Sequence, residues 1–203
     1  PKTGPLEEIE VSGKGNGKIL IIEVSGLLTS SRPNDVIARL FNRPSLPTRF
    51  KEELSKAAED EKVKGIVLRI NSPGGTVTAS DILHHEILEF KKKRKIPVVA
   101  CIMDLGTSGG YYLAAASDQI VAHPSAITGS LGVIMLTING SGLMEKIGLE
   151  AHTIKSGQHK DMGSPFRKMT AQDRAIFQSI IESFYQQFLE IIEQGRPQLT
   201  KEK

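Results

Sequence analysis

The stretch Asp104–Asp118 of the chain reads DLGTSGGYYLAAASD. It follows the apolar run Ile96–Met103 (IPVVACIM), which is typical of a buried strand. Glycines then predict a tight turn that carries Ser108, and small residues continue as a helix. A strand, a turn bearing a serine and a helix behind it present a hydroxyl as a nucleophile. The helix N-terminus also directs backbone N–H groups and the positive end of its dipole toward that serine.

The composition is that of an ordinary folded chain and argues against several functional classes. It has 203 residues, of which 39% are hydrophobic and 24% charged, with a net charge of +3. The basic run Lys91–Lys95 ends a predicted helix, where a solvated helix end is expected, and no basic stripe with aromatic residues suggests nucleic acid. No stretch approaches the ~20 apolar residues of a membrane span. The lone Cys101 lies in the apolar run and is expected in the core. We expect neither a metal nor a cofactor.

Strands and helices alternate along the chain, which predicts an α/β fold with a mainly parallel sheet. The first strand, Lys18–Val24, is continuously apolar, so we expect it to be buried on both faces. The glycine-rich turns Asn71–Gly75 and Leu105–Gly110 both follow strands, and the carboxyl ends of parallel strands share one edge. We therefore expect the two turns to form one site. Further strands are expected at Val63–Ile70, Gln119–Ala122, Val133–Ile138 and Glu150–Lys155, and helices at Phe50–Ala58, Thr76–Lys93, Leu143–Ile147 and from Thr170 onward.

A serine nucleophile needs an oxyanion hole, meaning N–H groups that stabilise the negative oxygen of the intermediate. Gly74 and Gly75 can turn an N–H group into a site, because glycine tolerates positive φ and has no Cβ. The N–H of Gly109, directly after Ser108, is the natural second donor. One such donor typically contributes ~3 kcal/mol. Taken alone, SPGG also fits an ordinary turn between a strand and a helix.

The base that would activate Ser108 can be a histidine or a lysine. His123 with Asp118 would complete a Ser-His-Asp triad, although nothing in the sequence makes them converge on Ser108. A lysine can act because burial lowers its pKa. Lys155 and Lys160 both lie in the loop KSGQHKDMG, and spacing does not choose between them. The remaining histidines are His84 and His85 in a predicted helix, His152 in a predicted strand and His159 in the loop.

Four motifs occur in order: IVLRINSPGG (Ile66–Gly75), SGGYYLAAASDQIVA (Ser108–Ala122), ITGSLGVI (Ile127–Ile134) and KSGQHKDMGSP (Lys155–Pro165). Together they resemble the signal peptide peptidase A family, membrane-anchored serine proteases of bacteria and plastids with the Clp/crotonase fold. The resemblance covers Lys18–Pro197. It implies repeated ββα units, with a mainly parallel sheet and helices outside. The set of four is specific, whereas SPGG alone also fits crotonases and Clp proteases.

The resemblance assigns roles to five residues. It places the nucleophile at Ser108 and the general base at Lys160, which form a Ser-Lys dyad. It places the oxyanion N–H groups at Gly75 and Gly109. Ser130, in ITGSLG, matches a serine that orients the lysine, because a neutral amine needs its lone pair directed at the hydroxyl. Clp relatives carry their histidine after the nucleophile helix, and SAITGSLGVI has none in that region, which favours the dyad.

The resemblance also implies an organisation for the protein. We expect residues 1–17 to be a linker after a missing N-terminal anchor, residues 18–197 to be the protease domain and residues 198–203 a truncated tail. The full-length protein is expected in the membrane, with its catalytic domain on the extracytoplasmic side, and this chain is expected to be soluble. Expected partners are peptide substrates, the membrane through a segment absent here and further copies in a homo-oligomer, but no nucleic acid. Some relatives complete the dyad between repeats or subunits, so Lys160 can meet its own Ser108 or a neighbour's.

The function implied is that of a serine endopeptidase that degrades remnant signal peptides and other extended apolar peptides at the membrane. One alternative is a catalytically silent scaffold of the same fold that oligomerises and binds peptides or membrane proteins. The intact set of Ser108, Ser130 and Lys160 argues against the scaffold. Another alternative is a crotonase-type acyl-CoA enzyme with the same two-glycine oxyanion hole. The Tyr111-Tyr112 helix and the lysine loop do not suggest a CoA site.

Overall fold

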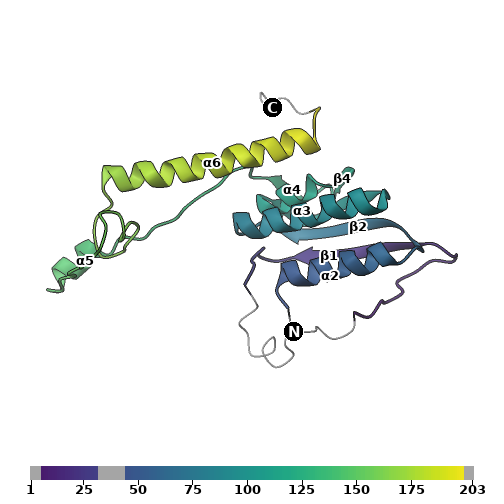
Figure 1. Cartoon of the computed structure of the whole chain (residues 1–203), viewed down its shortest axis with the longest axis horizontal. Coiled ribbons are helices and arrows are strands. Elements are labelled where there is room, and N and C mark those ends of the chain that lie inside the picture. The colour runs from purple at the N-terminus through teal and green to yellow at the C-terminus, as the bar shows by residue number, and fades with distance from the viewer. Residues whose placement is uncertain (1–5, 32–43, 199–203) are drawn as a thin grey trace. The chain divides into compact units, whose positions relative to one another are not determined.

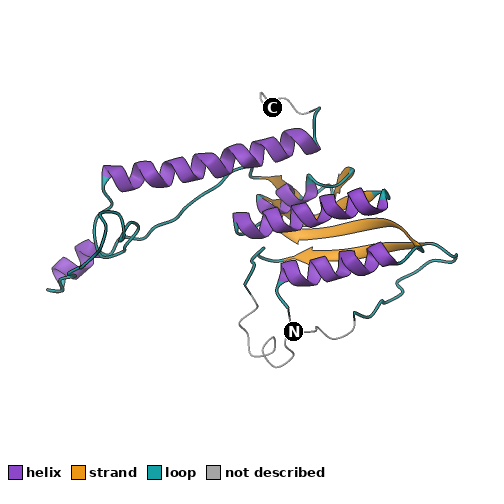
Figure 2. Cartoon of the chain, in the orientation of Figure 1, coloured by secondary structure: helices purple, strands orange, loops and turns teal. Residues whose placement is uncertain are grey.

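The computed structural model describes residues 6–31 and 44–198, so most of the predicted tail lies outside the described residues. The chain divides into two compact units. The first ends at Leu131 and resumes at Phe188, and the second runs from Gly132 to Gln187. Figures 1 and 2 show the elements, which are β1 (Lys18–Ser25), α2 (Leu46–Glu59), β2 (Val63–Ser72), α3 (Val77–Arg94), β3 (Val98–Thr107), α4 (Gly109–Ala114), β4 (Gln119–Ala122), β5 (Ile127–Gly129), α5 (Ser141–Lys146) and α6 (Ala171–Gly195).

The first unit is built on a parallel sheet with the strand order β1-β2-β3-β4, in which β5 also pairs with β3. The first half of β3 pairs with β4, where Val99 lies opposite Gln119. Its last three residues pair with β5, where Thr107 lies opposite Gly129. The predicted α/β class with a parallel sheet is confirmed. The strand that leads to Ser108 is therefore paired on both sides near its start and near its end, with a break at Met103 and Asp104.

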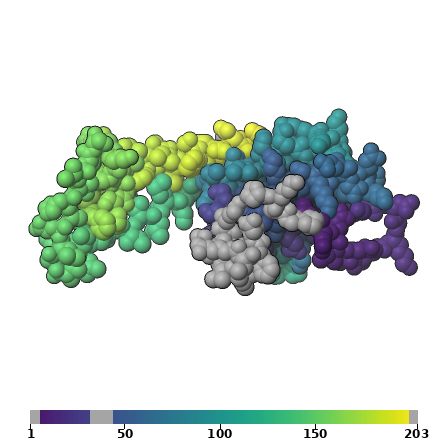
Figure 3. All heavy atoms as spheres, turned by 60° about the horizontal axis from the view of Figure 1, so that its bottom comes forward, coloured from purple at the N-terminus to yellow at the C-terminus, as the bar shows by residue number. Residues whose placement is uncertain are grey.

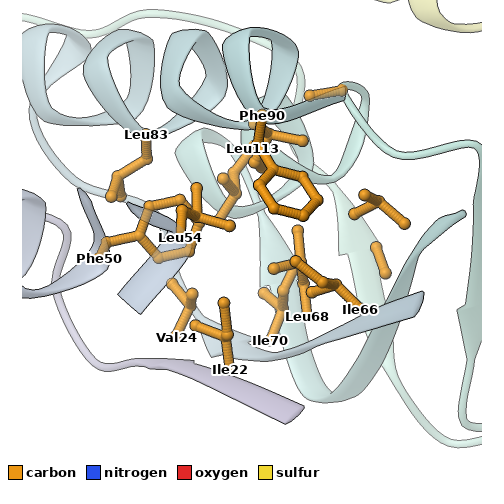
Figure 4. Close-up of a cluster of buried hydrophobic side chains, with 14 of the residues drawn as sticks. Ile22, Val24, Phe50, Leu54, Ile66, Leu68, Ile70, Leu83, Phe90 and Leu113 are labelled. Atoms are coloured by element: carbon orange, nitrogen blue, oxygen red, sulfur yellow. The ribbon is translucent and has the colours of Figure 1, made fainter. Parts of the chain in front are cut away.

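The core of this unit lies between one face of the sheet and the helices α2, α3 and α4. Every second residue of the strands is apolar and buried on this face, as the two-residue period of a strand requires. Burial of each large side chain is worth about 1.5–3 kcal/mol. Figure 4 shows side chains of this cluster, which include Ile22, Val24, Ile66, Leu68 and Ile70 from the strands and Phe50, Leu54, Leu83, Phe90 and Leu113 from the helices.

The other face of β1 is exposed in the described part of the chain. Ile19 is 61% and Ile21 is 47% exposed, although both are apolar. The expectation that the first strand is buried on both faces is therefore wrong. The reason is that the described helices pack on one face of the sheet. Only every second side chain of this apolar run therefore reaches the core.

The basic run at the end of α3 is more than a solvated helix end. Arg94 donates hydrogen bonds at 3.0 Å to the carbonyl oxygens of Ala57, Ala58 and Asp60, and at 3.1 Å to that of Val63. These carbonyls belong to the end of α2, to the turn that follows it and to the first residue of β2. The last carbonyls of a helix have no hydrogen-bond donor within the helix, and Arg94 supplies donors to those of α2.

The N-terminal segment returns to the same corner of the unit. Lys18 Nζ donates to Glu8 at 2.7 Å and to Asp60 at 2.8 Å, and Lys56 Nζ donates to the carbonyl oxygen of Leu6 at 2.6 Å. Residues 6–17 thus form a loop whose two ends are held, shown in purple in Figure 3. The contacts of Glu8 and Leu6 are exposed and that of Asp60 is part-buried, so solvent screens them and they contribute little to stability.

The last residues of α6 pack on α4 within the first unit. The ring centroids of Phe188 and Tyr112 lie 5.0 Å apart. A Cβ at Gly195 would lie 2.3 Å from the carbonyl oxygen of Ala115, so glycine is required there. Arg196 is buried and donates to the carbonyl oxygen of Ser117 at 3.1 Å. The helix that follows Ser108 is therefore held from its outer side.

The second unit contains α5, a loop and the first part of α6. Thr170 and Asp173 form a capping box at the start of α6, since each side chain accepts a hydrogen bond from the other's backbone N–H, at 3.0 and 3.1 Å. The strands expected at Val133–Ile138 and Glu150–Lys155 are not formed. Neither segment pairs with a described strand, and Ile134 and Ile154 are 92% and 102% exposed. An apolar alternating pattern needs a partner strand before it becomes a sheet.

Replacing Arg94 with methionine should lower the free energy of unfolding by about 2 kcal/mol or more, because four carbonyls lose a charged donor. Urea denaturation followed by circular dichroism measures this change. Lys92→Met, which removes an exposed charge from the same turn, should stay within about 0.5 kcal/mol of the wild type. Equal stability of the two variants would show that the Arg94 contacts contribute nothing.

Candidate active site

Ser108 occupies the first position of a strained turn between β3 and α4. Its φ is 50° and its ψ is −120°, a conformation that residues other than glycine rarely adopt. Its N–H donates to the carbonyl oxygen of Gly129 at 2.8 Å, and its own carbonyl accepts from the N–H groups of Tyr111 and Tyr112, both at 2.9 Å. Hydrogen bonds from β5 and from α4 therefore hold the turn in place against its strain.

The two glycine-rich turns lie against each other, as the sequence predicts. Gly74 has a φ of 98°, and a Cβ on it would lie 2.6 Å from the nitrogen of Gly109 and 3.0 Å from Ser108 Cβ. A Cβ on Gly109 would lie 3.3 Å from the nitrogen of Gly75 and 2.2 Å from Ser80 Oγ. The backbones meet without room for side chains. The backbone nitrogens of Gly75 and Gly109 therefore both belong to the place where the two turns meet.

Neither of these two N–H groups has an acceptor among the described residues. Gly109 is buried, and buried backbone N–H groups are almost always paired, so an N–H without a described acceptor directly after Ser108 is notable; Gly75 is exposed. Gly109 directly follows Ser108, and a Cβ on Gly109 would lie 3.3 Å from the nitrogen of Gly75. Two such donors can stabilise an oxygen that becomes negative when Ser108 Oγ attacks a carbonyl carbon.

The turn at Gly74 and Gly75 is shaped by residues that the sequence analysis missed. Leu28 N–H donates to the carbonyl oxygen of Gly74, and the Leu28 carbonyl accepts from Thr76 N–H, both at 2.8 Å. Ser72 is fully buried and its Oγ donates to the carbonyl oxygen of Gly26 at 2.6 Å while it accepts from Gly74 N–H at 3.1 Å. The signal for Ser72 was its position directly before Pro73. Leu28 carried no local signal.

Asn71 links the two turns through side-chain hydrogen bonds. Its Nδ2 donates to Asp104 Oδ2 at 2.8 Å, and its Oδ1 accepts from Leu105 N–H at 3.1 Å. At this point the pairing of β2 with β3 shifts, because Ile70 lies opposite Ile102 whereas Ser72 lies opposite Gly106. The extra residues of β3 form a bulge that Asn71 stabilises. This residue was also missed as part of the site.

The helices that follow the two turns are tied together as well. Tyr112 in α4 donates its hydroxyl to Asp81 in α3 at 2.7 Å. The ring of His84 meets Tyr112 edge-on, with centroids 5.3 Å apart. Burial lowers the pKa of His84 to about 4, so this histidine is neutral at pH 7. His84 therefore serves to join α3 and α4.

The alternative triad through Asp118 and His123 is not formed. Asp118 accepts from Val98 N–H at 2.8 Å and from Lys91 at 2.7 Å. Val98 begins β3 and Ser108 follows its end, so the carboxylate lies about 30 Å from the serine along a strand of ten residues. His123 contacts Ser125 Oγ at 2.8 Å and is exposed. Asp118 therefore cannot act as the carboxylate of a triad with His123 and Ser108.

The remaining predicted site residues are Ser130 and Lys160. Ser130 has a φ of 52° and directly follows Gly129, whose carbonyl binds Ser108 N–H. The structure thus brings Ser108, Gly75 and Gly109 together and places Ser130 one residue from that contact. Lys160 is exposed and belongs to the second unit, and the structure fixes no distance between it and Ser108. No cluster of His, Cys, Asp and Glu that could hold a metal occurs within residues 6–31 and 44–198.

A family model described as Peptidase family S49 matches residues 90–203. A protein of Enterococcus faecium with the provisional name signal peptide peptidase SppA is 36% identical over 94% of this chain and 54% of its own length. A provisionally named protease of Methanocaldococcus jannaschii is 41% identical over 70% of this chain and 45% of its own length. The chloroplastic serine protease SPPA of Arabidopsis thaliana is 35% identical over 68% of this chain and 20% of its own length. The chain spans about half the length of the first two relatives.

A Gly74→Ala substitution should disrupt the contact between the turns, because the added Cβ would meet Gly109 N at 2.6 Å and the backbone has a positive φ. We expect the rate at which a fluorophosphonate labels Ser108 to fall by about 10²-fold or more, the cost of losing one oxyanion donor. Gly142→Ala, where nothing lies within 4 Å of the new Cβ, is the control. Undiminished labelling of a folded Gly74→Ala chain would contradict the two-donor site.

Proposed function

The chain belongs to peptidase family S49, and from this we propose that it is a serine endopeptidase with a Ser-Lys dyad. The observation that carries the proposal is the contact between the two glycine turns, which sets Ser108 beside the N–H groups of Gly75 and Gly109, for which residues 6–31 and 44–198 supply no acceptor. A strained serine at the start of a helix, next to two unpaired donors, suits attack on a carbonyl carbon. Within the first unit, Asp118 accepts from Val98 N–H and His123 contacts Ser125, so these two residues do not complete a triad with Ser108.

In the proposed reaction, neutral Lys160 accepts the proton of the Ser108 hydroxyl while Oγ bonds to the scissile carbonyl carbon. The carbonyl oxygen takes the electron pair and accepts hydrogen bonds from Gly75 and Gly109. When the C–N bond breaks, Lys160 returns the proton to the leaving amine and an ester on Ser108 remains. Water then attacks the ester, gives a proton to Lys160 and releases the acid, and the proton returns to Ser108.

Ser130 is proposed to orient the amine of Lys160. Its support is that the residue before it binds Ser108 N–H at 2.8 Å, so the backbone on both sides of this contact is fixed. Ser130 is exposed and its positive φ turns the chain at this point. A hydroxyl at such a place can accept a hydrogen bond from an approaching amine and direct the nitrogen lone pair at Ser108.

A lysine acts as a base only when its amine is uncharged, which needs a dry surrounding. Lys160 is exposed in this chain, so we propose that a neighbouring copy covers it when the dyad forms. The chain exposes several large apolar side chains that a second copy could bury. They include Ile134, Leu136, Ile138, Ile147 and Ile154.

The proposed substrates are extended apolar peptides, among them remnant signal peptides. Exposed leucines lie next to both turns: Leu27 is 66% exposed and precedes the residue bonded to Gly74, and Leu131 is 39% exposed and follows Ser130. Such positions suit an extended peptide with apolar side chains. Among the described residues, no helix is long and apolar enough to cross a membrane, and anchoring of the full-length protein remains part of this proposal.

Ser108→Ala and Lys160→Ala should each reduce kcat/KM on a fluorogenic apolar peptide by about 10³-fold or more, because each removes a group that takes part in bond formation. Lys168→Ala removes an exposed lysine beyond the loop and should keep wild-type activity. The wild-type rate should rise with pH as the base loses its proton. Equal turnover of all four chains would overturn the dyad, and an inert wild type that still binds the peptide would favour the scaffold.

Mixing Ser108→Ala chains with Lys160→Ala chains tests whether the dyad forms between copies. If each serine meets a neighbour's lysine, about a quarter of the wild-type activity should return after the oligomer is dissociated and reassembled, because that fraction of random contacts pairs two intact residues. A mixture as inactive as either variant would place both residues of the dyad in one chain.

A further inference from the structure

The loop that carries Lys160 is folded back on itself. The N–H groups of Lys160, Met162 and Ser164 donate to the carbonyl oxygens of Gly157, His159 and Asp161, at 3.2, 3.0 and 3.0 Å. Each bond spans three residues, so the loop is a chain of consecutive turns. Consecutive turns make few backbone hydrogen bonds. Such a loop therefore needs side-chain contacts to hold one conformation.

Arg167 supplies these contacts through three donors. Its Nε and Nη2 donate to the two carboxylate oxygens of Asp161 at 3.0 and 2.9 Å, which is the paired geometry of an arginine–carboxylate fork. Its Nη1 donates to Asp173 Oδ2 at 2.6 Å. Lys155 also donates to Asp161 at 2.7 Å. Asp161 directly follows Lys160, so the fork fixes the backbone on one side of the lysine.

The other side of Lys160 is fixed through the same centre. His159 Nδ1 lies 3.2 Å from Asp173 Oδ1. The Asp173 side chain is only 1% exposed and is held in the capping box with Thr170 at the start of α6. Residues 159 and 161 are thus tied to one buried carboxylate and one arginine, whereas the side chain of Lys160 between them is exposed.

We propose that Arg167 is a positioning residue for the general base: its fork on Asp161 and its bond to Asp173 hold the backbone on both sides of Lys160, so that the amine leaves the loop in one direction. The inference rests on the proposed function, in which Lys160 is the base. It adds a residue with no contact to the reacting atoms. A lysine side chain has four rotatable bonds, and its reach is defined only when its backbone is fixed.

The charges of the cluster favour this arrangement throughout the working pH range. Arg167 first, then Lys155, holds the pKa of Asp161 below its usual range, and Arg167 likewise holds that of Asp173 low. Both carboxylates stay ionised well below neutral pH, and the guanidinium keeps its charge above it. The fork therefore does not open at the pH values at which a lysine would lose its proton. The device is a fixed clamp rather than a switch.

The test compares Arg167→Lys, Arg167→Gln and the control Arg174→Gln in the whole chain. Arg174 is exposed on the first turns of α6 and carries the same charge without a fork. Hydrogen exchange of the loop amides, measured by mass spectrometry, reports the clamp without reference to catalysis. We expect the amides of residues 156–164 to exchange at least about tenfold faster in both Arg167 variants, but not in Arg174→Gln.

Kinetic measurements on the same variants then show whether loss of the Arg167 contacts impairs Lys160 as the general base. In both Arg167 variants kcat should fall by about 10²-fold, with KM within about twofold of the wild type, because a misplaced base costs rate rather than binding. The position of the rising pH limb should stay unchanged, and Arg167→Lys should not rescue the rate because it keeps the charge but loses the fork.

Unchanged exchange of the loop in Arg167→Gln would overturn the clamp. Faster exchange with a wild-type kcat would overturn the positioning role, and a shifted pH limb rescued by Arg167→Lys would replace it with a role for the charge. If Lys160→Ala retains full turnover, the proposed dyad fails on its own account, and the exchange arm still decides whether Arg167 fixes the loop.

Discussion

The backbone contact between the turns at Gly74 and Ser108 is the constraint on which the rest of the structure depends. It is possible only because Gly74 and Gly109 have no Cβ, since a side chain on either would lie within 2.6 Å of the other turn or of α3. The parallel sheet brings the ends of β2 and β3 to one edge, Asn71 joins them, and Tyr112 joins the helices that follow. What results is a serine held in a strained conformation beside two N–H groups that have no acceptor in the described part of the chain.

The parts of the site that the sequence could predict are those that lie within a few residues of one another. Ser108 and the glycines beside it predict a turn after a strand. The four motifs indicate a family that the comparisons confirm. The roles of Asn71 and Ser72, which lie in the predicted turn, and of Leu28, which lies outside it, could not be predicted because their partners lie 33, 46 and 46 residues away. Leu28, for example, acts through its backbone, which no side-chain pattern reveals.

The errors in the fold have a common physical origin. The pattern of Val133–Ile138 describes a strand with one apolar face, yet a strand forms only against a neighbour, and none is described there. The apolar first strand suggested two buried faces, but its second face has no cover among the described residues. Arg94, in turn, looked like one charge in a solvated run and instead caps another helix. In each case the role of a side chain depends on the neighbouring strand, helix or carbonyl group that it meets, which the local sequence does not show.

The serine half and the lysine half of the proposed dyad are held by different physics, backbone packing in one and a buried ionic cluster around Arg167 in the other. The central claim is that they meet. The most direct test is the distance between Lys160 Nζ and Ser108 Oγ in an experimental structure of the assembled protein with a peptidyl inhibitor bound. The account predicts hydrogen-bond distance, about 3 Å, between a lysine and a serine of the assembly. A structure in which every Lys160 amine stays in solvent, with another base on Ser108, would contradict it.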